Sequence, residues 1–158
     1  MINHISLIPL IFSSIIIFLF GHPKIHDTPW YDNLKKPYYT PPSWVFSIIW
    51  PLLYILMGIS LERINNFPNC DIINNWCLPL IYFAIQLVLN YCWSILFFKY
   101  HKIKLALYDL ILLILFTLRL FFMIYNEDSI ASKLLLPYII WLFFALYLNF
   151  KIYKLNLK

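Results

Sequence analysis

Five long apolar segments make up most of this chain and constrain its fold more than any other feature. They cover about residues 5–20, 44–61, 78–98, 103–125 and 134–153. Each is near the roughly 17–25 residues that an α-helix needs to cross a bilayer. None alternates apolar and polar residues with the period of two that is typical of a membrane β-barrel. The sequence therefore predicts an all-α, polytopic membrane protein, a single bundle of five transmembrane helices over residues 1–158.

Composition excludes an ordinary soluble domain. Hydrophobic residues make up 63% of the 158 residues and charged residues only 12%. A soluble domain of this size cannot hide so much apolar surface, because a large part of any small domain stays exposed. The first segment has a length that a signal peptide could have. However, no Lys or Arg precedes Ile5 and no small-residue cleavage site follows Phe20, so we interpret it as a span that stays in the protein.

The lysines are distributed unevenly between the two ends of such a bundle. The first loop, the third loop and the tail carry Lys24, Lys35, Lys36, Lys99, Lys102, Lys104, Lys151, Lys154 and Lys158. With five spans these three regions share one face, and the positive-inside rule places that face in the cytoplasm and the N-terminus outside. The net charge of +5 follows from this face. We therefore expect anionic lipid head groups, and no nucleic acid, as its partner.

Cysteine and histidine patterns predict no metal site. The chain has no CxxC pair, and Cys70 and Cys77 lie in the second loop. We expect unpaired thiols there, with a disulfide on the non-cytoplasmic side as the alternative. His22 and His26 have a spacing that could hold a metal on a helix, but Pro23 between them is unfavourable for that geometry.

Polar residues in the third segment share one helical face. Gln86, Asn90 and Trp93 stand at positions i, i+4 and i+7. Amide groups and an indole N–H that point the same way would fix the orientation of a ligand. Alternatively, the amides hydrogen-bond to neighbouring helices and only hold the bundle together. The spacing alone leaves both interpretations open.

Aromatic residues follow helical spacing in two other segments. The two sets are Phe46, Trp50 and Tyr54, and Tyr138, Trp141, Ala145 and Leu148. Trp50 and Trp141 lie deeper than the interface anchors that tryptophans usually form at span ends. A shared aromatic cavity explains them better, although such stripes also occur in ordinary core packing. This cavity would suit a flat, apolar ligand of drug or tetrapyrrole size, with carboxylates attracted to the lysines at its rim.

Two charged residues interrupt the fourth segment without forming a catalytic arrangement. Asp109 and Arg119 stand about 15 Å apart along a helix, so they cannot pair with each other. We expect Asp109 to pair with Lys102, Lys104 or a neighbouring helix, and Arg119 to extend to the opposite interface. The chain shows no Ser-His-Asp order, carboxylate pair or nucleotide motif, so the sequence predicts no catalytic residues.

Aromatic, proline and amide residues occur in a distinctive order from about Gly21 to Lys154. They are Trp30, Tyr31, Leu34, Lys36, Pro37, Pro41, Pro42, Trp44, Trp50, Leu53, Tyr54, Met57, Gly58, Gln86, Leu89, Asn90, Trp93, Phe97, Phe98, Asp109, Pro137, Tyr138, Trp141 and Asn149. In this order they resemble the TspO/MBR family, the tryptophan-rich sensory proteins and translocator proteins, also called peripheral benzodiazepine receptors. So many matches are far more specific than one short motif.

The resemblance implies five transmembrane helices, assembly as a homodimer, and a pocket open toward the first loop. Trp50 and Asn90 would orient a ligand carbonyl. The first loop, residues 21–43, would act as the lid, with Trp30 and Tyr31 over the ligand. The pocket lining would be Tyr31, Pro41, Phe46, Trp93, Trp141, Ala145 and Leu148.

The resemblance also implies a function. We expect a receptor-like protein of a bacterial membrane or the mitochondrial outer membrane that binds porphyrins, haem-related tetrapyrroles and benzodiazepine-site ligands. No cofactor is required, since the tetrapyrrole is the ligand. The alternatives are light-dependent porphyrin breakdown with Trp50 and Trp141, and a small exporter of lipids or amphipathic compounds. Cholesterol binding stays open, because Phe150 stands where the recognition pattern has Tyr.

Overall fold

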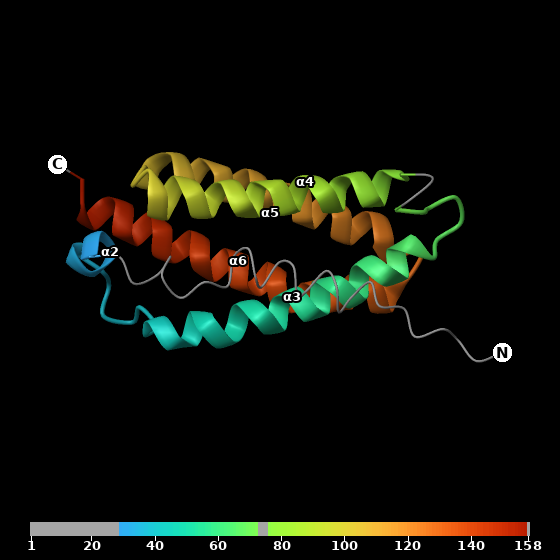
Figure 1. Cartoon of the computed structure of the whole chain (residues 1–158), viewed down its shortest axis with the longest axis horizontal. Helices are drawn as coiled ribbons and strands as arrows, with labels where there is room; N and C mark the ends of the chain where they lie inside the picture. The colour runs from blue at the N-terminus through green and yellow to red at the C-terminus, as the bar shows by residue number, and fades with distance from the viewer. Residues whose placement is uncertain (1–28, 73–75, 158) are drawn as a thin grey trace.

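The computed structural model describes residues 29–72 and 76–157, and in this part the chain is a bundle of long helices (Figure 1). The helices are α2 (Pro29–Asn33), α3 (Ser43–Asn65), α4 (Leu78–Ser94) with its π-helical continuation η2 (Ile95–Lys99), α5 (Ile103–Tyr125) and α6 (Ser129–Leu155). Four spans within the described residues are long and apolar enough to cross a membrane. The predicted helical membrane class is confirmed. The first predicted span, about residues 5–20, lies outside the described residues.

The helix bounds follow hydropathy closely in the middle of the bundle and less closely at its ends. Helix α5 coincides with the predicted segment 103–125. Helix α6 begins at Ser129, earlier than the predicted 134, because the Asp128 carboxylate caps it. That carboxylate accepts hydrogen bonds from the backbone N–H groups of Ile130 (2.8 Å) and Ala131 (3.0 Å). An N-cap extends a helix over polar residues, and hydropathy cannot detect this.

The core lies between the four long helices. Helix α5 packs along α4 and α6, and α3 packs along α6. The buried apolar side chains of this core include Leu53, Met57, Ile64, Leu80, Phe83, Leu110, Leu113, Leu120, Ile124, Leu135 and Leu142.

The outer surface of the bundle is apolar as well. Each long helix exposes large aliphatic side chains, such as Ile48 (61% exposed), Val88 (60%), Leu115 (57%) and Ile140 (68%). Exposure of such a surface to water is unfavourable in free energy, whereas contact with the hydrocarbon of a bilayer is not. The chain is therefore an integral membrane protein.

Figure 1 shows helix α2, which lies in the predicted lid segment 21–43, the turn between η2 and α5, and the C-terminus at the same end of the bundle. Two contacts join these segments: Lys35 is hydrogen-bonded to Asn156, and the ring of Trp30 stacks on that of His101. We call this the lysine-rich end, after Lys35, Lys36, Lys99, Lys102, Lys104, Lys151 and Lys154.

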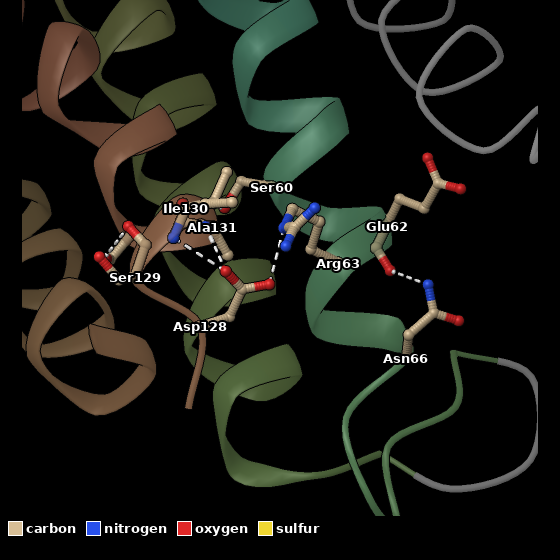
Figure 2. A network of polar contacts seen from close by, with 9 residues as sticks. Ser60, Glu62, Arg63, Asn66, Asp128, Ser129, Ile130 and Ala131 are labelled. Carbon is tan, nitrogen blue, oxygen red and sulfur yellow. Dashed lines mark hydrogen bonds and ion pairs between the residues drawn. The ribbon is translucent and has the colours of Figure 1, made fainter. Parts of the chain in front are cut away.

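The opposite end of the bundle is held by the polar contacts shown in Figure 2. Arg63 of α3 donates from Nε to Oδ2 of Asp128 at 2.6 Å. The hydroxyl of Ser60 donates to the carbonyl oxygen of Ala131 at 2.9 Å. These contacts fasten the end of α3 to the first turn of α6.

A disulfide joins Cys70 and Cys77, so the expectation of unpaired thiols is wrong. The chain reverses direction after α3, and Asn69 takes the left-handed conformation with φ of 60°. The side chain of Asn65 accepts a hydrogen bond from the backbone N–H of Ile72 at 2.7 Å, which holds the reversed segment. The two cysteine Cα atoms come within 5.0 Å, a separation that a disulfide can bridge.

Asp109 forms no ion pair with Lys102 or Lys104 in the part of the chain that the structure describes, so these two pairings are wrong, whereas a partner on a neighbouring helix stays a prediction. Lys102 lies about 10 Å away along the helix axis, and Lys104 is five residues away, on another face. The Asp109 Oδ2 atom is buried and accepts no hydrogen bond from residues 29–72 or 76–157.

Candidate functional site

A small cavity lies between the lid helix α2 and the inner faces of α3, α4–η2 and α6, near the lysine-rich end. Its lining residues are Tyr31, Phe46, Trp93, Phe97, Phe98, Ala145, Leu148, Asn149 and Ile152. The free space inside is about 40 Å³. Pockets for drug-sized ligands usually exceed about 300 Å³. The cavity is therefore too small for such a ligand in this structure, and a large ligand requires its walls to move apart.

The π-helical segment η2 turns two consecutive phenylalanines toward the cavity. Phe97 and Phe98 are only 2% and 7% exposed, although neighbours on an α-helix point about 100° apart. A π-helical turn contains more residues, so it changes which side chains face inward, and such turns are frequent at functional sites. The centroid of the Trp93 ring lies 5.6 Å from that of Phe97 and 5.9 Å from that of Phe98. These three rings form one aromatic wall.

Helix α2 covers this wall from outside. It begins at Pro29, a residue whose fixed φ suits the first position of a helix. The ring centroid of Trp30 lies 5.7 Å from that of Phe97 and 4.0 Å from that of His101. The ring centroid of Tyr31 lies 5.7 Å from that of Phe98. The lid is thus held by ring contacts on its inner side.

Polar contacts hold the segment that follows α2. The backbone N–H of Lys35 donates to Oδ1 of Asn156 at 3.1 Å, and Nδ2 of Asn156 donates to the carbonyl oxygen of Lys35 at 2.9 Å. The Lys36 ammonium lies 3.9 Å from the centroid of the Tyr31 ring and 3.9 Å from a carboxylate oxygen of Asp32. Burial, and to a lesser extent Asp32, raises the pKa of Tyr31, so its phenol is neutral at physiological pH. We call the paired hydrogen bonds between Lys35 and Asn156 the lid latch.

A second aromatic cluster lies beside the cavity, in the core. The ring of Trp50 stacks on that of Tyr54, with centroids 5.4 Å apart, and meets the ring of Trp141 edge to face at 6.5 Å. The ring of Phe46, whose centroid is 5.6 Å from that of Trp141, belongs both to this cluster and to the cavity wall. Trp50 and Trp141 do not themselves line the cavity.

Asn90 connects three helices. Its Oδ1 accepts a hydrogen bond from the hydroxyl of Tyr54 on α3 at 3.4 Å. Its Nδ2 donates to the hydroxyl of Tyr138 on α6 at 2.8 Å. These contacts correspond to the structural alternative, in which the amide holds helices together. Gln86 is fully buried, and its amide has no hydrogen-bond partner among residues 29–72 and 76–157.

The structure brings some of the candidate residues together and separates others. The candidates that line the cavity are Tyr31, Phe46, Trp93, Ala145 and Leu148. Trp30 packs over the cavity from outside, and Pro41 lies in the connection between α2 and α3. The candidates in the neighbouring core are Trp50, Tyr54, Gln86, Asn90 and Trp141.

The cavity also contains residues that the ligand-site prediction missed: Phe97, Phe98, Asn149 and Ile152. Three of them could have been found by extending the predicted helical faces by one turn. Phe97, Asn149 and Ile152 each follow a predicted cavity residue by four positions, which places them on the same face. Phe98 follows Trp93 by five positions, so its place in the lining agrees with the π-helical backbone of η2.

The TspO/MBR family profile matches residues 5–155 of the chain. Protein CrtK of Rhodobacter capsulatus is 35% identical over 127 residues, which are 80% of this chain and 78% of that protein. Tryptophan-rich protein TspO of Archaeoglobus fulgidus is 43% identical over 129 residues, 80% of each chain. Translocator protein of Sus scrofa is 34% identical over 131 residues, 80% of this chain and 75% of that protein.

Proposed function

This chain belongs to the TspO/MBR family, and from that premise we propose that it binds porphyrins or haem-related tetrapyrroles in the aromatic cavity. It would serve as a membrane receptor for sensing, sequestration or transport, and benzodiazepine-site ligands would occupy the same cavity. The observation that carries the proposal is the lining, which among the described residues is mostly aromatic and aliphatic, with the amide of Asn149 and no charged side chain.

The two walls of the cavity suit a flat ring system. Trp93, Phe97 and Phe98 offer ring faces and edges on one side. Ala145 leaves room on the other side, because its methyl group is the smallest side chain of the lining. Stacking against several aromatic rings favours planar ligands beyond the burial of apolar area alone. The acidic groups of a tetrapyrrole would face the lysine-rich end, where they remain hydrated and find opposite charges.

The test is to fill the cavity. The substitution Ala145→Phe adds a ring inside it, whereas Ile140→Phe adds one on the outer surface of the same helix, where Ile140 is 68% exposed. We expect Ala145→Phe to weaken the binding of protoporphyrin IX about tenfold or more, since overpacking of this kind costs about 1–3 kcal/mol. Quenching of tryptophan fluorescence in detergent measures the affinity. Equal affinities of the wild type and both variants would refute the cavity as the binding site.

Light-dependent porphyrin breakdown is a second candidate function. It is favoured by the edge-to-face pair of the buried Trp50 and the partly buried Trp141, which Phe46 joins to the cavity wall. Under light and dioxygen, this function predicts loss of the main porphyrin absorbance and a bilin-like product. Trp141→Phe should suppress that product, while Trp44→Phe, at a 63% exposed position, should not. If both variants lost porphyrin at the same rate, breakdown by this tryptophan pair would be refuted and only the binding function would remain.

We further propose that the lysine-rich end faces the cytoplasm, in accordance with the positive-inside rule. Tyr38 is 98% exposed at that end, so Tyr38→Cys provides a reporter there. A membrane-impermeant maleimide should label this cysteine only after the cytoplasmic side is opened. Labelling of intact cells or organelles would show the reverse orientation.

A further inference from the structure

Asn149 is a buried residue of the cavity lining whose amide has no hydrogen-bond partner in the described part of the chain. It lies on α6, is 2% exposed and belongs to the cavity lining. Neither its Oδ1 nor its Nδ2 has a hydrogen-bond partner within residues 29–72 and 76–157. The indole nitrogen of Trp93, another lining residue, is buried and also lacks an acceptor in that part of the chain.

This state is unfavourable unless a ligand relieves it. A buried donor or acceptor without a partner loses its hydration and gains nothing in return. Asn90 shows how the same bundle can satisfy a buried amide, since Tyr54 and Tyr138 occupy its two ends. Gln86 also has no partner among the described residues, but it lies outside the cavity lining, whereas Asn149 is part of it. Within the described residues, the amide of Asn149 has a donor and an acceptor without partners, and the indole of Trp93 in the same mainly apolar lining has a donor without one.

We infer that Asn149 and Trp93 form a polar subsite that binds a neutral lactam, or another cis-amide edge, of a flat ligand. The inference rests on the proposed function and specifies the chemistry of the ligand. A cis-amide carries an N–H and a carbonyl oxygen side by side, so it can donate to Oδ1 and accept from Nδ2 of Asn149 together. Its carbonyl oxygen has a second lone pair for the indole N–H of Trp93.

A carboxylate fits this subsite less well. It could accept from Nδ2 and from the indole N–H, but it would leave Oδ1 without a donor. It would also place a negative charge where the part of the lining that comes from residues 29–72 and 76–157 contains no cationic side chain. Burial of a charge without a counter-ion is strongly unfavourable. The neutral amide edge of a ligand therefore points inward, and its acidic groups point toward the lysine-rich end.

The experiment uses three bicyclic probes of similar size in lipid nanodiscs: 2-quinolinone, which is a lactam, N-methyl-2-quinolinone, which lacks the donor, and naphthalene. Titration calorimetry, with empty nanodiscs subtracted, gives the affinities. We expect the wild type to prefer 2-quinolinone about tenfold over each of the other two, the usual effect of unpaired buried hydrogen-bonding groups. Asn149→Leu, which keeps the side-chain size, should abolish the preference over naphthalene without weakening naphthalene binding.

Thr117→Val is the matched control. Thr117 is buried on α5, outside the cavity lining, and its hydroxyl donates to the carbonyl oxygen of Leu113. This variant also removes a buried polar group and should keep the preference for the lactam. If Asn149→Leu does not fold, the comparison of 2-quinolinone with its N-methyl derivative in the wild type decides alone.

The outcomes separate this inference from the proposed function. Equal affinities for the three probes, or an unchanged preference in Asn149→Leu, would overturn the lactam subsite. So would the absence of any probe binding while protoporphyrin IX still binds, and both results leave the proposed function intact. Failure of protoporphyrin IX and of all three probes to bind would overturn both.

Discussion

Removal of the lid latch should loosen the lid without unfolding the bundle. The substitution Asn156→Ala deletes both hydrogen bonds to the backbone of Lys35, at 3.1 and 2.9 Å. The inner ring contacts of Trp30 remain, including its stacking on His101. The lid therefore keeps its place as the dominant conformation but opens more often.

The magnitude follows from the two hydrogen bonds. Each contributes about 0.5–1 kcal/mol to the closed state, at the lower end of the usual range because the site is partly hydrated. Their loss amounts to about 1–2 kcal/mol, which raises the equilibrium constant for lid opening about 5–30-fold. Asn156→Asp keeps the acceptor for the Lys35 N–H and loses the donor. We therefore expect Asn156→Asp to change the free energy of lid opening by about half as much as Asn156→Ala does.

Amide hydrogen exchange of residues 29–36 measures the opening, because exchange of these groups follows transient local opening. The expected result is faster exchange confined to this segment, by the factor given above. Asn66→Ala is the control, since Nδ2 of Asn66 donates to the carbonyl oxygen of Glu62 at the opposite end of the bundle. Unchanged exchange in Asn156→Ala, or equally faster exchange along the whole chain, would refute the latch.

Two further predictions concern stability in detergent, measured by thermal unfolding. Asp128→Ala removes the N-cap of α6 and the partner of Arg63, and should cost about 1–2 kcal/mol. Burial raises the pKa of Asp128, but the hydrogen bonds from Arg63 and two backbone N–H groups outweigh it, so the pKa lies below its usual value. This contribution is complete above about pH 5 and is lost as the pH falls through the folded-state pKa. Tyr138→Phe leaves Nδ2 of the buried Asn90 without its acceptor and should cost about 1–3 kcal/mol.

Exposed residues of the same types provide the controls for these two predictions. Glu127→Ala removes a carboxylate next to the cap, and Tyr125→Phe removes a hydroxyl from a 48% exposed ring. Both should change the free energy of unfolding by less than about 0.5 kcal/mol. If the stability of Asp128→Ala fell with acid as that of the wild type does, the contacts of Asp128 would not stabilise the fold. If Tyr138→Phe were as stable as Tyr125→Phe, the hydrogen bond from Asn90 to Tyr138 would not stabilise it either.

The long helices were predictable because the bilayer fixes both their length and their outer surface. Helix α5 coincides with its predicted bounds for this reason. Helix α2 was not predicted, because its five residues contain no apolar repeat and are held by contacts with distant segments. The π-helical geometry of η2 was not predicted, and the disulfide after α3 was only the alternative to unpaired thiols, since both depend on packing that no local pattern encodes.

The candidate site was predictable by helical face and not by depth. The i, i+4 spacing selected the faces on which Phe46, Trp93 and Ala145 meet the cavity. The same rule selected Trp50 and Trp141, which lie on those faces but pack in the neighbouring core. Periodicity gives the direction of a side chain from its helix axis. It does not give the level along the bundle at which two facing helices stand far enough apart to leave a cavity. That level depends on the packing of the neighbouring helices and of the lid.

The two ends of the bundle differ in how firmly they are held, and this difference indicates where a ligand enters. At the far end a disulfide, a 2.6 Å ion pair of Arg63 with Asp128, and the Ser60 hydroxyl fasten the helices (Figure 2). At the lysine-rich end the closure depends on α2, with its ring contacts and one side-chain amide. Regions that open for binding have low local stability. We therefore expect a ligand to displace α2 and to leave α3 packed on α6. Hydrogen exchange that protected α2 more strongly than the facing ends of α3 and α6 would contradict this order of opening.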